Sequence, residues 1–495
     1  MCPQQEEGGD VGGRGGWSFF GDIAGRSAGA LGYANGPIRA QIGTPLICGW
    51  NWQAAEKIFP RLWGLTPDFP SGKLVPMKVL VLSNLYPPHY VGGYELRCRD
   101  VVEALVGKGH EVVVLTSDHH LPGVQEAPSR YPVHRVLRLN GYCGKPWRGI
   151  WKLRHVERHN NEQLRALLTE VAPDIVHVWN MGGLSKSLAL TLQGMQVPTV
   201  YDVSDHWIAR SLAADVWLAW WNNANLPVWS RLARGLVTAL GWRRRWQTVA
   251  PTNPRSHVQF QRIYFCSQRL KDLTVEKGYS VGHGGVIHCP VDTMLYDGMP
   301  KPAERPVKKL LYAGRLAEDK GVFTALKAMK LLKGKFDGEL SIYGRGEAAY
   351  EARLKEYART NELRVTFHAA GPEEMPKVYK EHDALLFTSE WEEPFALTPL
   401  EAMSSGLPVV GTTTGGSAEL FRHGQNALTY RSGDSWELSQ RILQLVSHPE
   451  WRFQMASCGR KEVREQYPLA HIVTRIERYL EETLSCWRPA TLPPF

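Results

Sequence analysis

The sequence has no uninterrupted apolar run near the roughly 20 residues that a membrane-spanning helix needs. Its N-terminus is acidic and glycine-rich, whereas a secretory signal peptide is basic and then apolar. The 8 cysteines are scattered, with no C-x-x-C pair and no histidine cluster at metal-ligand spacing. These absences argue against a secreted or membrane-spanning protein and against structural zinc, and they favour a reducing compartment. We therefore expect a cytoplasmic protein.

The sequence also lacks the short motifs of several common enzyme classes. It has no Walker A sequence, no G-x-S-x-G elbow and no D-x-D triplet for a metal-bound nucleotide. The glycines after its first apolar run, Gly92 and Gly93, do not form the G-x-G-x-x-G fingerprint of nicotinamide and flavin enzymes. We expect neither a cofactor nor a metal.

Basic residues outnumber acidic residues, with 58 lysines and arginines against 49 aspartates and glutamates. A surplus of this size suits a polyanionic substrate, an anionic membrane surface or a nucleic acid, and it does not choose among them. The basic residues are dispersed and no nucleic-acid-binding module is recognisable, so we expect no nucleic-acid partner. The hydrophobic content of 43% is ordinary for a globular protein, and 495 residues are too many for one core.

The pattern of the chain changes at Met77. Residues 1–76 are rich in glycine, and their aromatic residues show no period, which predicts a dispensable disordered extension. From Met77 short apolar runs alternate with helical stretches, as in a doubly wound parallel sheet. A stretch with prolines near both ends, residues 290–306, interrupts this alternation, which then begins again. The sequence predicts two α/β domains, residues 77–295 and 296–466, joined by a hinge.

The apolar runs that we expect to form strands fall into two groups. In the first domain they are MKVLVLS, HEVVVLTS, DIVHVWN, PTVYDVS and RIYFCS. In the second they are KLLYAGR, GELSIYG, RVTFHA, ALLFTS and LPVVGT. Ligands of such sheets bind at the carboxyl ends of the strands, so strand-end loops of both domains would line a cleft between them.

Positive side chains follow the first predicted strand of the second domain. Arg315 ends the run KLLYAGR, and Lys320 stands beside Gly321 at the start of the next helix. Cations beside the free N–H groups of a helix start suit a diphosphate, although two solvated surface charges would give the same local pattern. Gly344 in SIYGRGE ends another strand, where backbone can approach a ligand closely.

Two carboxylates, Glu393 and Glu401, stand eight positions apart in SEWEEPFALTPLEAMSSG. Thr398 suits an N-cap, Glu401 falls where a capping-box glutamate would be, and Gly406 suits the helix end. Capping therefore accounts for Glu401. It leaves Glu393 without a structural explanation, which favours a functional role for this residue.

These motifs occur together and in order. EPFALTPLE, Glu393 to Glu401, has E-x7-E spacing; VIHCPVD and GRLAEDKG precede it, and it continues into EAMSSGLPVVGTTTGG. From Met77 to about residue 485 the sequence resembles the retaining glycosyltransferases of the two-domain GT-B fold, which include bacterial mannosyl-, glucosyl- and N-acetylglucosaminyltransferases. The resemblance implies two Rossmann-like domains facing across a cleft, the first binding the acceptor and the second the nucleotide sugar. It also implies that a helix within residues 467–495 returns to the first domain.

The resemblance implies roles for individual residues. Arg315 and Lys320 would hold the donor's diphosphate, Glu401 would bond the ribose hydroxyls, and Glu393 would lie beside the sugar's hydroxyls. The other residues that would contact substrate are Gly92, Gly93, Gly344, Phe395, Ala396, Leu397 and Thr398. Negative charge builds on the leaving diphosphate, and two fixed cations with a helix N-terminus stabilise it, a role that other folds give to a metal.

Two positions depart from the family pattern. Many members have glycine where this chain has Ala396, and the extra methyl group would narrow the choice of donor. The family often has histidine and aspartate after the strand here written PTVYDVSDHW, and the histidine position is Ser204. We expect Asp205 to be the acceptor-side polar group, while His206, two positions beyond Ser204, is the alternative.

Residues 215–247 hold six tryptophans among several arginines. This combination favours a membrane interface, and equally a sugar- or lipid-lined acceptor groove. A packed helical pair that covers the sheet would also account for it. The hypothesis that we test is that the segment faces the acceptor and contacts anionic lipid at the inner face of the membrane.

The sequence thus predicts a metal-independent, retaining hexosyltransferase. It would move a sugar from a nucleotide-diphosphate sugar to a hydroxyl of a glycan, a lipid-linked acceptor or another cell-envelope glycoconjugate. The alternative is a catalytically silent nucleotide-sugar-binding protein of the same fold, which Ser204 at the expected histidine position favours.

Overall fold

The structure is a computed structural model of the chain, and it describes residues 76–126 and 128–488. The predicted disordered extension falls on residues 1–76, and all but the last of these lie outside the described residues. Within the described ranges, no helix is both long and apolar enough to cross a membrane.

The first half of the described chain forms a sheet of 7 strands, all parallel, in the order β3-β2-β1-β4-β5-β6-β7. The strands are β1 (Lys78–Leu82), β2 (Glu111–Ser117), β3 (Val133–Leu137), β4 (Ile175–Val178), β5 (Thr199–Val203), β6 (Ile263–Phe265) and β7 (Gly285–Val286). The helices between them are α1 (Gly93–Gly107), α2 (Ile150–Val171), α3 (Ser187–Gly194), α4 (Val216–Asn222), α5 (Val228–Ala239), α6 (Trp242–Gln247) and α7 (Gln268–Glu276), with a π-helical turn, η2 (Trp207–Leu212), and a 3₁₀ turn, η3 (Arg255–His257).

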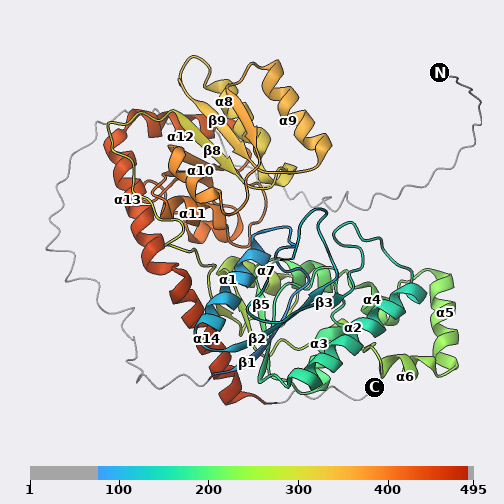
Figure 1. The fold of residues 1–495 in the computed structure, drawn as a ribbon. Helices are drawn as coiled ribbons and strands as arrows, with labels where there is room; N and C mark the ends of the chain where they lie inside the picture. The colour runs from blue at the N-terminus through green and yellow to red at the C-terminus, as the bar shows by residue number, and fades with distance from the viewer. Residues whose placement is uncertain (1–75, 127, 489–495) are drawn as a thin grey trace, which may run out of the picture. The chain divides into compact units, whose positions relative to one another are not determined.

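The second half forms a parallel sheet of 6 strands in the order β10-β9-β8-β11-β12-β13. The strands are β8 (Lys309–Ala313), β9 (Glu339–Tyr343), β10 (Val365–His368), β11 (Ala384–Phe387), β12 (Val409–Thr412) and β13 (Leu428–Tyr430). The helices are α8 (Val322–Leu331), α9 (Ala348–Thr360), α10 (Met375–Glu381), α11 (Leu397–Ser404), α12 (Ser435–Ser447), α13 (Pro449–Gln466) and α14 (Leu469–Cys486), with 3₁₀ turns η4 (Glu318–Lys320) and η5 (Gly415–Glu419). The predicted GT-B architecture of two parallel α/β sheets is confirmed (Figure 1).

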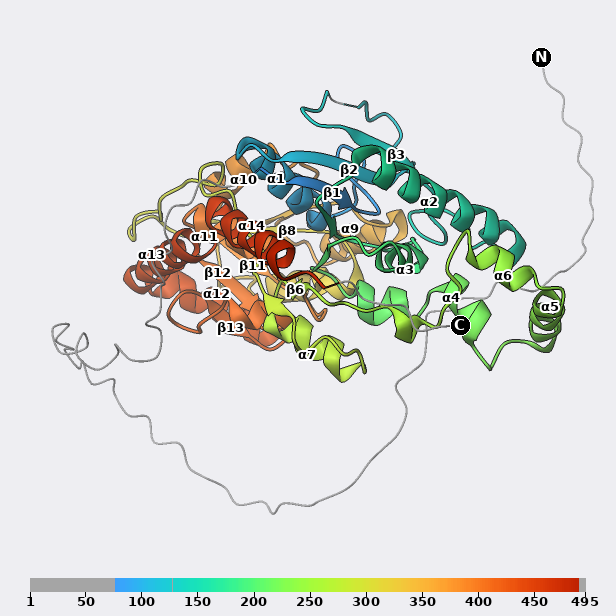
Figure 2. The same ribbon diagram turned by 90° about the horizontal axis from the view of Figure 1, so that it is seen from below.

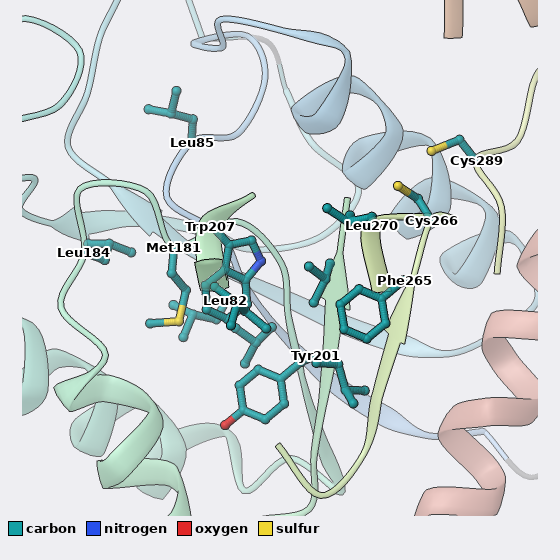
Figure 3. Packing of buried hydrophobic residues seen from close by; sticks show 14 of the residues in the cluster. Leu82, Leu85, Met181, Leu184, Tyr201, Trp207, Phe265, Cys266, Leu270 and Cys289 are labelled. Carbon is teal, nitrogen blue, oxygen red and sulfur yellow. The ribbon is translucent and has the colours of Figure 1, made fainter. Parts of the chain in front are cut away.

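Strand β1 shows why the apolar runs were readable as strands. Leu80 and Leu82 enter one hydrophobic cluster and Val79 and Val81 another, so the strand is buried on both faces. Figure 3 shows one of these clusters, in which Leu82 lies among residues of other strands and loops. A strand covered by helices on both sides needs apolar residues at every position.

Helix α14 lies along α1, beside the first sheet (Figures 1 and 2). Ile472 and Ile476 are fully buried in the cluster that contains Val79. Between the helices, the Glu477 carboxylate lies 2.5 Å from Lys108 Nζ and 2.8 Å from His110 Nε2. The last described helix is therefore tied to the first sheet by both apolar packing and charge.

Three strands were missed by the sequence analysis, because they are short or only half-buried. Strand β3 reads VHRVL, and four of its five residues are partly exposed. Strands β7 and β13 have 2 and 3 residues at the ends of their sheets. A search for buried apolar runs does not detect edge strands of this kind.

Candidate functional site

A cleft of about 1700 Å³ is lined by strand-end loops of both sheets. Of the predicted site residues, those that line it are Gly92, Gly93, Asp205, Arg315, Lys320, Glu393, Phe395, Ala396, Leu397, Thr398 and Glu401. The clustering follows from topology, since the carboxyl ends of parallel strands share one edge of each sheet. The structure thus brings together eleven of the twelve residues that the sequence analysis singled out.

Gly344 is the exception. It does not line the cleft, and its N–H donates to the carbonyl of His368 at 3.0 Å. A Cβ atom on it would lie 1.9 Å from the carbonyl oxygen of Gly314. The absence of a side chain on Gly344 allows the neighbouring loop, which carries Arg315, to pass close by, and the contact of Gly344 with the donor stays a prediction.

Lys320 and Glu393 form an ion pair in the cleft wall, with Nζ 2.5 Å from Oε1. Lys320 ends the turn η4 after β8, and Glu393 lies on the loop after β11, so the pair bridges neighbouring strands. The Ser389 hydroxyl donates to the same carboxylate oxygen at 2.6 Å. The carboxylate is 9% exposed, and its second oxygen is not used by these bonds. The ammonium group is thereby fixed at the cleft surface.

Arg315 follows β8 and lines the same cleft, with its side chain 58% exposed. Its guanidinium lies 3.3 Å from the Asp319 carboxylate, a weak pairing that leaves most of its donors for a ligand. Two cations, from Arg315 and Lys320, therefore stand on one side of the cleft.

Glu401 lies in α11, and its Oε2 accepts a hydrogen bond from the Tyr379 hydroxyl at 2.7 Å. Burial raises the pKa of this carboxyl. The predicted capping role is wrong: α11 begins at Leu397 with Ala396 as its N-cap residue, so Thr398 lies within the first turn. Glu401 then falls one turn deeper, where it faces the cleft rather than the helix start.

The start of α11 lies against the start of α1. A Cβ atom on Gly93 would lie 2.6 Å from Cδ1 of Leu397, so a larger residue at position 93 would displace the end of the Leu397 side chain. The free N–H groups at both helix starts thus border one cleft. Glu95 was overlooked: its Oε2 accepts from the Gly92 N–H at 2.9 Å, and the three-residue spacing in GGYE is a readable capping signal.

On the first sheet's side, Asp205 lines the cleft and His206 does not. Asp205 accepts hydrogen bonds from the Trp207 N–H at 2.6 Å and the Asn180 amide at 3.0 Å, while burial raises its pKa to about 6. His206 Nε2 lies 2.8 Å from the carbonyl of Glu392, and burial lowers its pKa.

Ser204, at the position where histidine was expected, is engaged by a buried ion pair. Its hydroxyl lies 2.6 Å from Asp202 Oδ1 and accepts from Arg97, whose guanidinium is 2.9 Å from the other Asp202 oxygen. His177, also on this sheet, bonds the Tyr264 hydroxyl at 2.8 Å, and burial lowers its pKa to about 4. His177 is fully buried away from the cleft, while Ser204 lines the cleft with its hydroxyl bound to Asp202 and Arg97.

The loop that carries Glu393 is held by the first sheet. Ser267 donates to the carbonyl of Pro394 at 2.6 Å, and Arg269 lies 2.6 Å from the Glu392 carboxylate. Trp391 stacks under the Arg210 guanidinium at 4.0 Å. No sequence motif marked these partners, because they meet only when both sheets are in place.

Among the described residues, one group of side chains has the composition of a metal site: His89, His120 and Glu126, of which Glu126 lines the cleft. The Leu121 N–H donates to Nδ1 of His89 at 3.1 Å, so that nitrogen carries no proton and Nε2 must carry it in the neutral ring. A protonated Nε2 cannot ligate a metal, and Glu126 is paired with Arg135 at 2.5 Å. These residues do not fit a metal centre.

Comparisons with known proteins agree with this architecture. A family model described as Glycosyltransferase Family 4 matches residues 91–295, and one described as Glycosyl transferases group 1 matches residues 300–462. The first model covers β2 to β7 of the first sheet, and the second covers all six strands of the second sheet. The matched regions therefore follow the division that the fold shows.

Among curated proteins, the chain is 21% identical over 415 residues to an uncharacterized glycosyltransferase of Methanocaldococcus jannaschii, covering 79% of this chain and 94% of that one. It is 24% identical to a glycogen synthase of Mycobacterium tuberculosis, covering 80% and 93%. Among solved structures, Anabaena HepE in complex with UDP and glucose is 19% identical, with TM-score 0.57 and coverage of 82% and 100%. Sucrose-phosphate synthase from Thermosynechococcus elongatus is 18% identical, with TM-score 0.60 and coverage of 83% and 99%.

Proposed function

Because the two adjoining family models identify the chain as a glycosyltransferase of the GT-B fold, we propose that it moves a hexose from a nucleotide-diphosphate sugar to a hydroxyl group, with retention of the anomeric configuration. The observation that carries the proposal is the Lys320–Glu393 pair, which stands in the cleft beside Arg315 and the start of α11. The solved complexes of Anabaena HepE with UDP and glucose and with UDP-glucose support the class of donor.

The positive groups suit the charge that transfer creates. When the bond between the anomeric carbon and the diphosphate oxygen breaks, that oxygen keeps the electron pair. Lys320, Arg315 and the N–H groups at the start of α11 offer fixed donors to the resulting negative charge. Because these donors are held in place before reaction, no metal is needed in this role, and we propose a metal-independent enzyme.

The two carboxylates, Glu393 and Glu401, would each bind a different one of the donor's remaining parts. Glu393, with one oxygen bound to Lys320, has its other oxygen for the hydroxyls of the sugar. Glu401, which receives one bond from Tyr379, has acceptor capacity left for the ribose. Ala396 at the cleft adds a methyl group near the sugar and would restrict the donor's substituents.

The acceptor would enter from the first sheet. Asp205 is the polar side chain there that we assign to the acceptor hydroxyl, because His206 bonds a backbone carbonyl and Ser204 is held by Arg97. The acceptor class that we propose is a glycan or a lipid-linked glycan of the cell envelope. The alternative of a silent nucleotide-sugar-binding protein draws its support from the engagement of Ser204.

A transfer assay separates the two functions. The purified chain is incubated with each of several nucleotide sugars, and released nucleoside diphosphate and new glycosidic product are followed by proton NMR. Turnover with an unchanged anomeric coupling, lost in Glu393→Gln, is the result expected of the enzyme. Saturable donor binding with no turnover for any donor would establish the silent binder instead.

A further inference from the structure

The six tryptophans of residues 215–247 divide into two sets. Trp217, Trp220, Trp221 and Trp246 are at most 7% exposed and pack on one another, with ring centroids of Trp220 and Trp221 4.7 Å apart. These four are core, so the prediction of an interfacial surface does not apply to them. Trp229 and Trp242 are 83% and 45% exposed, and Trp229 belongs to α5.

Helix α5 turns an apolar face outward. The exposed residues of this face are Val228, Trp229, Leu232, Leu236 and Leu240, with exposed fractions between 53% and 83%. Their spacing of three and four places them on one side of a helix, and Val237, on the other side, is 2% exposed. Figures 1 and 2 both draw α5 at the margin of the first sheet's helices, beside α6. Apolar side chains on this scale, gathered on one face, mark an interaction surface.

The segment that carries this face has charged side chains of one sign. Residues 216–271 contain no aspartate or glutamate. Arg231, Arg244 and Arg245 are exposed, and among the described residues no carboxylate lies within 4.0 Å of their guanidinium groups. Arg234 and Arg243 are used internally: the first donates to the carbonyl of Asn223 at 2.9 Å, and the second lies over Trp221. Of these exposed cations, Arg231 lies on α5 itself, and Arg244 and Arg245 lie on α6, which contacts α5.

We propose that the outward face of α5, with Arg231, Arg244 and Arg245, docks on the surface of an anionic lipid bilayer. An interfacial helix needs apolar side chains that enter the acyl boundary and cations that meet the headgroups, and α5 with α6 supplies both. A second copy of the chain is a poorer occupant, because two copies of this face would bring their arginines together without acids between them. The inference does not depend on the proposed reaction, and it would locate that reaction at a membrane surface.

Vesicle flotation tests this surface. The full chain is mixed with vesicles of phosphatidylcholine alone, or of phosphatidylcholine with phosphatidylglycerol. We expect binding to the anionic vesicles and a loss of at least tenfold in the double variant Trp229→Ser/Leu236→Ser. The matched control is Trp436→Ser, which removes a tryptophan that is 61% exposed on α12, and its binding should equal that of the unaltered chain.

The charge is tested with Arg244→Gln/Arg245→Gln. Each arginine removed should weaken binding to anionic vesicles about fivefold. The control Lys355→Gln/Arg359→Gln on α9 should leave binding unchanged. Failure to bind both kinds of vesicle would overturn the proposal, and so would an equal loss of binding in the Trp436→Ser control. It would also be overturned if the chain without lipid sedimented as a dimer and the Trp229→Ser variant sedimented as a monomer.

Discussion

At the scale of single residues, the most direct prediction concerns Lys320. Replacing it with alanine removes a fixed cation from the cleft, and a lost donor of this kind costs about 3 kcal/mol of transition-state stabilisation, or about a hundredfold in kcat. We expect Lys320→Ala to show this loss in steady-state transfer kinetics. Lys355→Ala, which removes an exposed lysine of α9, should keep the full rate; equal losses in both variants would exclude a role for the cleft cation.

Asp205 predicts a pH dependence. Burial raises its pKa to about 6, so below that pH the carboxyl group is mostly protonated and loses the negative charge with which it would bind and take up the proton of the acceptor hydroxyl. The apparent kcat/KM for the acceptor should therefore fall as the pH decreases through about 6. Asp205→Asn should have low activity without this limb; a limb that persists in the variant would assign it to another group.

The contact between Gly93 and Leu397 can be tested with two single variants and the double variant. A methyl group on Gly93 would overlap Cδ1 of Leu397, so Gly93→Ala should raise the KM for the donor by disturbing the start of α11. Leu397→Ala removes the overlapping atom and should restore most of the KM in the double variant. Losses that simply add in the double variant would show that the two residues act separately.

At the scale of elements, α14 contributes stability through its packing on α1. Ile476 is fully buried, and Ile476→Ala should lower the free energy of unfolding by about 3 kcal/mol, the central value for deleting a large buried aliphatic side chain. Arg478→Ala, at an exposed position of the same helix, should change it little. Both are read from urea unfolding curves, and a negligible effect of Ile476→Ala would mean that the helix is dispensable.

An element could be predicted when its neighbours in the sequence determine it, and could not when contacts with distant parts of the chain determine it. Strand β11 is apolar at every position and β1 at every position after Lys78, because both faces of each strand are covered, and their runs were visible in the sequence. The cap of α11 was misplaced because Thr398, Pro399 and Glu401 form a good local signal, while the helix in fact begins at Leu397 against Gly93. That contact joins residues three hundred positions apart in the chain, and local propensity contains nothing of it.

The tryptophan-rich segment shows the same limit. Its composition fits core, groove and membrane surface alike, and only the packed structure separates the buried Trp217 from the exposed Trp229. The cleft residues were easier to predict from the sequence, because the topology of a parallel sheet brings its strand-end loops together. Their partners, such as Tyr379 for Glu401, carry no motif and emerge only from the fold.

At the scale of the whole molecule, bonds between the two sheets hold the loop that carries Glu393. They include His206 to the carbonyl of Glu392 and Ser267 to that of Pro394.

Cleavage after residue 466 would remove α14 and expose the apolar surface that it covers on the first sheet. We expect the chain truncated there to unfold at a lower temperature and to lose transfer activity; unchanged values for both would refute the coupling.

The proposal that transfer needs no metal is also tested on the whole cleft. Two cations and the start of α11 lie on the second sheet's side of the cleft, the start of α1 borders it from the first sheet, and the His89 group does not fit a metal. Transfer in excess EDTA should therefore proceed at the unaltered rate. A loss of activity that Mg²⁺ or Mn²⁺ restores would contradict this part of the account.

The most direct test of the account is a thermal-shift panel of UDP-, GDP- and ADP-sugars, measured on the unaltered chain and on Lys320→Ala. Binding to the folded state raises the apparent unfolding temperature by mass action. We predict that a nucleotide sugar raises this temperature in the unaltered chain and that Lys320→Ala abolishes most of the rise. A full rise in the variant, at the same donor concentration, would show that the diphosphate does not lie beside the cleft cations and would contradict the central claim.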